Sequence, residues 1–139
     1  MRVVVDASVA AKWYFPEPGR AAADALLEGA AAGRHDLLAP DLVAAELPNV
    51  LWKKVRREEC DEETAREILD LWEVDRPRLV ASDLLAPRAL DLAFQLQLSV
   101  YDALYLAAAI EFEAALATAD GRLARAARSV LAEVLAVED

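Results

Sequence analysis

Four acidic side chains of this sequence border apolar stretches, where carboxylates are uncommon. An ionised group in such a place must be paired, hydrogen-bonded or bound to a metal ion. Several of them in one place repel one another unless a cation neutralises them. These residues therefore indicate a site for a divalent metal ion. The four are Asp6, Glu46, Asp102 and Asp120.

Each acid taken alone also has a simpler structural explanation. Asp6 or Ser8 could cap a helix that follows the first strand. Asp102 could be a helix cap or a first-turn acid, and Asp120, which precedes a glycine, could belong to a turn. Glu46 is harder to explain in this way, because its neighbours at helical spacing are apolar. The combination favours a metal site, since it replaces four separate explanations with one.

Other catalytic chemistries fit the sequence poorly. The single histidine, His35, is interpreted as a surface loop residue, which leaves a serine or cysteine nucleophile without a base. Only four glycines are present, and none forms a phosphate-binding loop after the first strand. A receiver domain or an Asp-x-Asp phosphatase needs a further acid at Ala7 or Ser8. The lone Cys60 cannot form an internal disulfide and is interpreted as an exposed helix residue.

The elements that must position these acids alternate between strands and helices. Strands are expected at 2–5, 37–39, 79–80 and 115–118, helices at 8–14, 21–32, 41–57, 62–73, 84–97, 101–112 and 121–128, and an apolar stretch ends the series at 134–137. Such alternation predicts an α/β fold with a parallel sheet covered by helices on both faces. Ligands bind beyond the carboxyl ends of strands in these sheets. Asp6 and Asp120 each follow a strand, so both should face one crevice, to which Asp102 could point back from the first turn of its helix.

Length and composition limit the class of protein. With 139 residues, 57% of them hydrophobic, the chain is expected to form one domain over residues 1–139. No apolar stretch is long enough to span a bilayer, so we expect a cytoplasmic protein that does not bind membranes. Either burial or a surface for a homodimer or a partner would explain the tryptophans Trp13, Trp52 and Trp72.

The net charge of −10 argues against simple electrostatic wrapping of nucleic acid. It does not exclude a nuclease, because carboxylates loaded with divalent cations present positive charge to a phosphate. Basic residues also cluster locally. These clusters, at Lys53–Arg57 and at Arg122, Arg125 and Arg128, are either solvated helix faces or contacts with a substrate or partner.

Several stretches occur in an order and spacing that a known family shares. They are Val4–Val9, Glu46 followed by Asn49, Ser99–Ala107 and Ala117–Leu123. In these stretches the chain resembles the PIN-domain ribonucleases and, more narrowly, the VapC toxins of bacterial and archaeal toxin–antitoxin pairs. The resemblance covers essentially the whole chain, and the segments Tyr101–Ala107 and Thr118–Leu123 are its most specific parts.

The resemblance implies a PIN-like three-layer fold, a central parallel sheet flanked by helices, with Mg²⁺ or Mn²⁺ in an acidic pocket. It implies that the chain is an endoribonuclease that needs this ion and no other cofactor, and that a small antitoxin protein neutralises it. Separately, we expect a homodimer. The residues implied as catalytic are Asp6, Glu46, Asp102 and Asp120, of which Asp6, Asp102 and Asp120 bind metal, with Ser8 and Thr118 as supporting hydroxyls.

One residue departs from what the implied site needs. Pro48 lies two residues after Glu46, where it cannot donate an amide and its ring would crowd the carbonyl of Ala44. We therefore expect a kink or a helix break near Glu46. The alternative function is a non-catalytic module of the same fold, whose acidic pocket binds a basic partner segment. A titration of Mg²⁺ or Mn²⁺ against nuclease activity separates the two.

Overall fold

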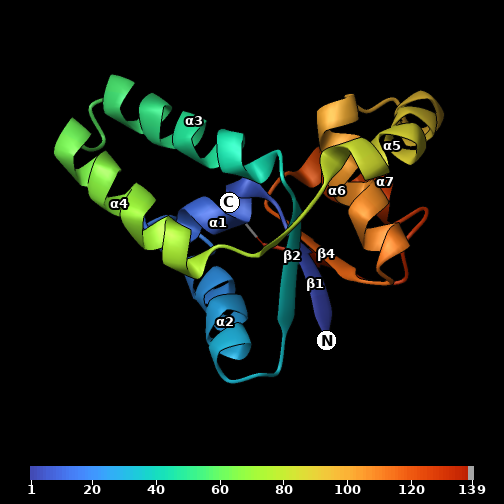
Figure 1. The fold of residues 1–139 in the computed structure, drawn as a ribbon, viewed down its shortest axis with the longest axis horizontal. Helices are drawn as coiled ribbons and strands as arrows, with labels where there is room; N and C mark the ends of the chain where they lie inside the picture. Colours follow the sequence, from blue (N-terminus) through green and yellow to red (C-terminus); the bar gives the residue numbers. More distant parts are fainter. Residues whose placement is uncertain (138–139) are drawn as a thin grey trace.

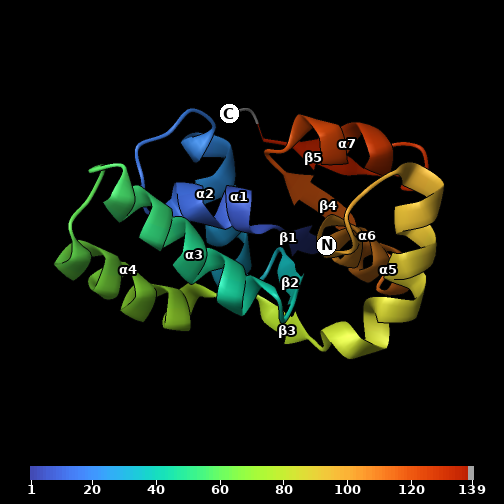
Figure 2. The same ribbon diagram turned by 90° about the horizontal axis from the view of Figure 1, so that it is seen from above.

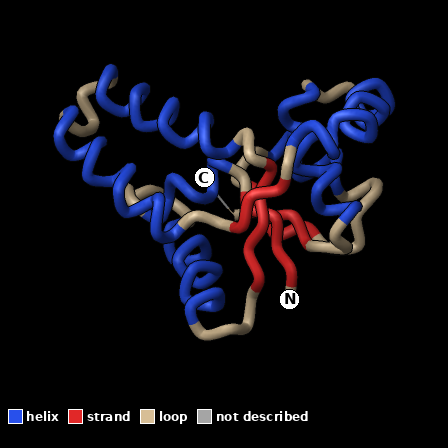
Figure 3. Tube along the Cα trace, in the orientation of Figure 1, coloured by secondary structure: helices blue, strands red, loops and turns tan. Residues whose placement is uncertain are grey.

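A five-stranded sheet, parallel throughout, lies at the centre of the computed structural model, which describes residues 1–137 (Figure 3). Its strands are β1 (Arg2–Val5), β2 (Asp36–Pro40), β3 (Arg78–Val80), β4 (Ala115–Thr118) and β5 (Val134–Ala136). They lie in the order β3-β2-β1-β4-β5. The parallel sheet expected from the sequence is confirmed, and the final apolar stretch supplies its fifth strand.

The two central strands are apolar because both of their faces are covered. Val3, Val4 and Val5 of β1 are fully buried, and all of β4 is buried as well. Strands buried on both faces are typical of parallel sheets and have continuous apolar runs. The register pairs Val4 with Leu116, so the two strands end side by side.

Helices cover both faces of the sheet and make three layers. They are α1 (Ala7–Ala10), α2 (Arg20–Ala31), α3 (Val43–Arg56), α4 (Glu62–Asp75), α5 (Ser82–Leu96), α6 (Val100–Glu111) and α7 (Gly121–Ala127), with a 3-10 helix, η1 (Ala11–Trp13). The helices α1 to α4 lie on one face and α5 to α7 on the other (Figure 2). The α3–α4 hairpin extends away from the sheet (Figure 1). This is the predicted three-layer α/β arrangement.

Two local expectations were wrong. The helix expected at 8–14 is only one turn of α-helix, Ala7–Ala10, which tightens into η1 before the prolines that follow. Of the kink or break expected near Glu46, the break does not occur, since α3 runs uninterrupted through Pro48. The helix tolerates this proline because Ala44, whose carbonyl loses its amide partner, is exposed and open to water.

The single histidine and the single cysteine both lie outside helices. His35 is in the loop before β2, as expected, but it is half-buried against Gly29, where a Cβ atom would come within 2.1 Å of the ring atom Cδ2. Cys60 is not an exposed helix residue. It is partly buried in the turn between α3 and α4, because the helix ends at Arg56 and the next begins after its cap, Asp61.

The tryptophans divide between the core and the surface. Trp13 and Trp72 are 5% and 1% exposed and pack against each other with ring centroids 6.2 Å apart, whereas Trp52 is 54% exposed. None of the helices in residues 1–137 is by itself long and apolar enough to cross a membrane. The helices α5 and α6 reach the necessary length and apolar composition only when they are taken together, and the chain bends by 113° between them.

Candidate active site

Asp6 and Asp120 lie where the order of the strands reverses. β1 pairs with β2 on one side and with β4 on the other, and the chain winds outward from β1 in both directions. Asp6 directly follows β1, and Asp120 comes two residues after β4. Crevices beyond the carboxyl ends of strands at such switch points are the usual ligand sites of open α/β sheets.

All four acids predicted from the sequence line one cleft at this edge. The cleft has a volume of about 240 Å³. Glu46 comes from the first turn of α3 and Asp102 from the first turn of α6, so helices from both faces of the sheet contribute. The residues of the predicted set found in its lining are Asp6, Ser8, Glu46, Asp102 and Asp120.

Asp6 is the most buried of these carboxylates, at 6% exposed. Its Oδ1 accepts hydrogen bonds from Ser8 Oγ at 2.5 Å and from the amide of Val9 at 3.1 Å, while Oδ2 accepts one from Thr118 Oγ1. Burial raises the pKa of Asp6 despite these donors, and the charge of Asp120 raises it further. Asp6 thus caps the helix α1, as the structural explanation from the sequence predicted, and it also faces the other acids of the cleft.

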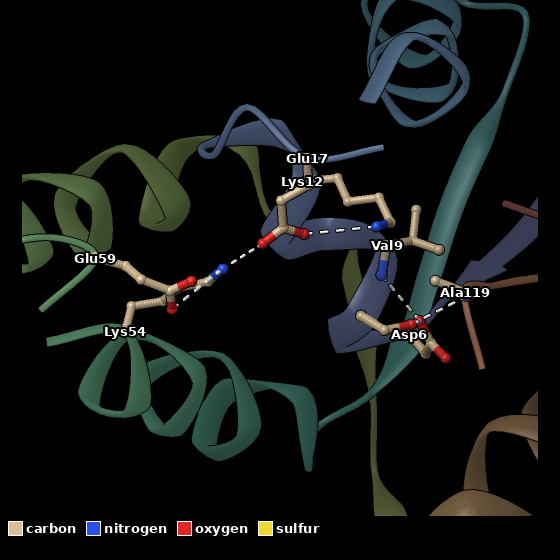
Figure 4. Close-up of polar contacts among 8 residues, drawn as sticks. Asp6, Val9, Lys12, Glu17, Lys54, Glu59 and Ala119 are labelled. Carbon is tan, nitrogen blue, oxygen red and sulfur yellow. Dashed lines mark hydrogen bonds and ion pairs between the residues drawn. The ribbon is translucent and has the colours of Figure 1, made fainter. Parts of the chain in front are cut away.

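Ser8 and Thr118 join the ends of β1 and β4. Besides donating to Asp6, Ser8 Oγ accepts from the amide of Ala119 at 3.1 Å, and Thr118 Oγ1 accepts from the amide of Asp120 at 3.0 Å (Figure 4 shows Asp6, Val9 and Ala119). Both hydroxyls therefore fix the carboxylate of Asp6 and the backbone that leads to Asp120. Their supporting role in catalysis stays a prediction.

Glu46 reaches the cleft in spite of Pro48 and is held there by Tyr105. The Tyr105 hydroxyl donates to Glu46 Oε1, and this tyrosine is 2% exposed. Burial raises the pKa of Glu46, and the charges of Asp6 and Asp102 raise it further, while the tyrosine hydroxyl works in the opposite direction. The pKa of Tyr105 is likewise raised by burial and by Glu46, so its proton stays on the oxygen.

Asp102 and Asp120 occupy helix starts on the same side of the sheet. Asp102 lies three residues after Ser99, whose Oγ accepts its amide at 3.1 Å and caps α6. Burial raises the pKa of Asp102, and Asp120 adds to the effect. Asp120 caps α7, because its Oδ1 accepts the amides of Arg122 at 2.9 Å and Leu123 at 3.3 Å.

The donor set suits a hard divalent cation held partly through water. Carboxylate and hydroxyl oxygens line the cleft, and such ligands are preferred by Mg²⁺ and Mn²⁺. Within residues 1–137, no three His, Cys, Asp or Glu side chains stand close enough to hold one ion between them. Since Mg²⁺ keeps several waters when few protein ligands hold it, the donor set of this cleft suits an ion held partly through bridging water.

Three further cleft residues were not predicted as site residues. Tyr105, Asn49 and Lys53 all line the cleft. Helical spacing is the feature of the sequence that could have indicated them. Asn49 and Lys53 follow Glu46 by one and two helical turns, and Tyr105 follows Asp102 by one turn. Spacing alone does not separate these positions from an ordinary buried stripe.

Comparisons with known proteins agree with this arrangement. A family model described as PIN domain matches residues 3–129. Ribonuclease VapC3 from Pyrobaculum aerophilum is 37% identical over 126 residues, which cover 89% of this chain and 93% of that protein. The crystal structure of PAE2754 from Pyrobaculum aerophilum has a TM-score of 0.73 and 23% identity, covering 99% of this chain and 84% of that one. The crystal structure of FitAcB from Neisseria gonorrhoeae has a TM-score of 0.62 and 17% sequence identity, and the match covers 96% of each chain. At these identities the two structures bear on the fold alone.

Proposed function

This chain belongs to the PIN domain family, of the VapC type, and we propose that it is a metal-dependent endoribonuclease acting as the toxin of a toxin–antitoxin pair. The observation that carries the proposal is the convergence of four carboxylates on one cleft beside β1 and β4. Burial raises the pKa values of Asp6, Glu46 and Asp102, and the charges of the neighbouring acids raise them further, so a cation in the cleft would favour the ionised forms of all three.

The metal would be held by Asp6, Asp102 and Asp120, directly or through water. Asp6 is the fixed member, because Ser8 and Thr118 bind its two oxygens. Bound Mg²⁺ or Mn²⁺ supplies an acidified water as nucleophile and offsets the charge that develops on the phosphate. Burial disfavours the ionised forms of Asp6 and Asp102, and a cation favours them.

Glu46 is suited to orient the attacking water and to accept its proton. Tyr105 fixes the side chain through Oε1, and the raised pKa of Glu46 brings it closer to the range in which a carboxylate works as a general base. Lys53 lies at the same cleft and contributes a positive charge that a phosphate can contact. RNA is then oriented by cationic side chains and cut at the acidic ones.

A metal titration with single-stranded RNA tests the catalytic proposal. We expect no cleavage by the purified chain in EDTA and cleavage that rises and saturates with Mg²⁺ or Mn²⁺. A protein that binds Mn²⁺ yet leaves RNA intact would favour the alternative function, in which the acidic cleft binds a basic partner segment without catalysis. That alternative has a physical basis, because an arginine side chain can neutralise the same repelling carboxylates.

The toxin role rests on the VapC type and needs a cellular test. We expect expression of the wild-type chain alone to arrest growth, and co-expression of a small cognate antitoxin to restore it. The antitoxin would place an arginine in the cleft, where its planar guanidinium can pair with two carboxylate oxygens. Normal growth with abundant, folded protein would count against this role. A cytoplasmic location and a homodimer also stay predictions, and fractionation and sedimentation of the expressed chain test them.

A further inference from the structure

The acidic cleft is continued by a second hollow on the exposed side of α3. This hollow has a volume of about 290 Å³, and the residues that line it are Trp52, Lys53, Arg56 and Arg57. We propose that it is a subsite for single-stranded RNA, which binds the nucleotides next to the scissile phosphate. The proposal rests on the proposed function and extends it to how the substrate is held.

Lys53 connects the two sites, because it lines both the acidic cleft and this hollow. It follows Glu46 by two turns of α3, and a further turn on come Arg56, the last residue of the helix, and Arg57, its C-cap. A strand whose phosphate lies at the acids can therefore follow α3 from one cavity into the other. The three cationic side chains are spaced along that path.

The structure separates these cations from their neighbour Lys54. The Lys54 ammonium pairs with Glu17, approaches Glu59 at 3.8 Å and lies 4.8 Å from the centroid of the Phe15 ring (Figure 4). Lys54 thus ties α3 to the segment after η1. In the described part of the chain, Lys53, Arg56 and Arg57 enter no ion pair, so their charges remain available to a phosphate.

Trp52 gives the hollow an aromatic surface for a base. It is 54% exposed, and the guanidinium carbon of Arg56 lies 4.9 Å from the centroid of its ring. Proteins that bind single strands combine such cationic grooves with exposed aromatic rings on which bases stack, with arginine adding cation–π contacts. Bases are available for stacking only in single-stranded RNA, which selects this class of substrate.

The charge of the hollow favours RNA over a protein partner. A chain with a net charge of −10 here gathers three cations beside one exposed tryptophan. The other side of Trp52 borders a largely apolar groove between α3 and α4, which includes Leu51 and Leu69 and has a different chemistry. A polyanion such as RNA fits the hollow in which Trp52 lies beside these three cationic side chains.

Tryptophan fluorescence tests the subsite directly, because Trp13 and Trp72 are buried and Trp52 is exposed. The background variant is Glu46→Gln, which should not cut the probe, a ten-nucleotide oligoadenylate, and which keeps the three acids proposed to bind the metal. We expect the oligonucleotide to quench the fluorescence, and Trp52→Phe to abolish this quenching. Trp52→Ala should weaken binding about tenfold through lost stacking. Trp52→Phe should weaken it less, because a ring remains.

The salt dependence of binding tests the cations. Replacing Arg56 and Arg57 together by alanine should make the slope of log K against log salt shallower by about 1.4, the effect of two lost phosphate contacts on a single strand. Arg34→Ala is the matched control, because Arg34 is exposed in the loop before β2, at the opposite edge of the sheet, and should leave both affinity and slope unchanged.

The outcomes distinguish this inference from the proposed function. If the wild-type chain cuts RNA but the Trp52 and Arg56–Arg57 variants bind it as the background does, the subsite is refuted and the nuclease stands. If RNA quenches Trp52 but the wild-type chain never cuts, the subsite stands and the nuclease fails. Variants that lose only antitoxin binding would assign the surface to protein and overturn the inference.

Discussion

Asp102 is the carboxylate whose charge can be removed with least damage to its surroundings. Its cap, Ser99, binds the backbone amide, which an asparagine retains. We expect Asp102→Asn to abolish metal-dependent RNA cleavage, because a ligand charge is lost, while thermal stability without metal holds or rises, because repulsion with Asp120 is relieved. Cleavage at the wild-type rate in saturating Mg²⁺ would exclude the ligand role. Asp6→Asn should also be inactive, but it disturbs the hydrogen bonds from Ser8 and Thr118.

The raised pKa values at the cleft predict how stability depends on pH. A carboxyl group whose pKa is higher in the folded state holds more protons there, so its contribution to folding is fully present below the ordinary value, 3.8 for Asp102, and is lost as pH rises through the folded pKa. The thermal advantage of Asp102→Asn over the wild type in chelator should therefore be largest near neutral pH and shrink as the solution is acidified. An advantage independent of pH would contradict the assignment.

Tyr105 is expected to act on the reaction only through Glu46. Tyr105→Phe removes the hydroxyl that donates to Oε1, so the pKa of Glu46 should rise further and kcat should fall more than KM changes. The buried hydrogen bond also contributes about 1 kcal/mol to folding, which thermal unfolding would register. Tyr101→Phe, at an exposed tyrosine, is the control. An unchanged pH profile of kcat would leave Tyr105 with a structural role alone.

At the scale of elements, the helix α3 contains an unfavourable proline two residues after the site residue Glu46. Pro48 lies inside the helix and leaves the Ala44 carbonyl without an amide donor. Pro48→Ala should restore this hydrogen bond and raise the free energy of unfolding by about 1 to 3 kcal/mol, from the single hydrogen bond to the full helix preference of alanine over proline. Chemical denaturation measures the change, with Ala45→Gly, an exposed position of the same helix, as a variant that should lower stability instead. A loss of stability in Pro48→Ala would show that the proline ring packs favourably.

How much of these elements could be predicted depends on where the determining contacts lie. The strands β1 and β4 were predictable because each is a short apolar run that a polar residue ends, Asp6 after β1 and Thr118 at the end of β4. The lengths of β2 and β3 were not predictable, since pairing with neighbouring strands adds Asp36, which lies opposite Arg2 of β1, and Arg78, which lies opposite Leu38 of β2. The four acids were found from their settings, but the contact of Tyr105 with Glu46 spans 59 residues and has no local signal.

At the scale of the whole molecule, the charge limits how RNA is held. With a net charge of −10, binding should depend on the loaded cation and on the few basic residues along α3. We expect weak, metal-dependent affinity with a slope of log K against log salt of about −2, the value for three phosphate contacts on a single strand. Filter binding at several salt concentrations measures it. Tight binding in EDTA with a steep slope would reveal an extended basic groove instead.

The pairing of β1 with β4 also governs when activity can arise during synthesis. The hydroxyl that binds Asp6 Oδ2 comes from Thr118, which is synthesised 112 residues after Asp6. A nascent chain therefore carries Asp6 without the strand that completes the cleft until β4 has been synthesised. Contacts this distant in sequence also form slowly. The proposed nuclease can therefore become competent only after β4 has been synthesised and has paired with β1.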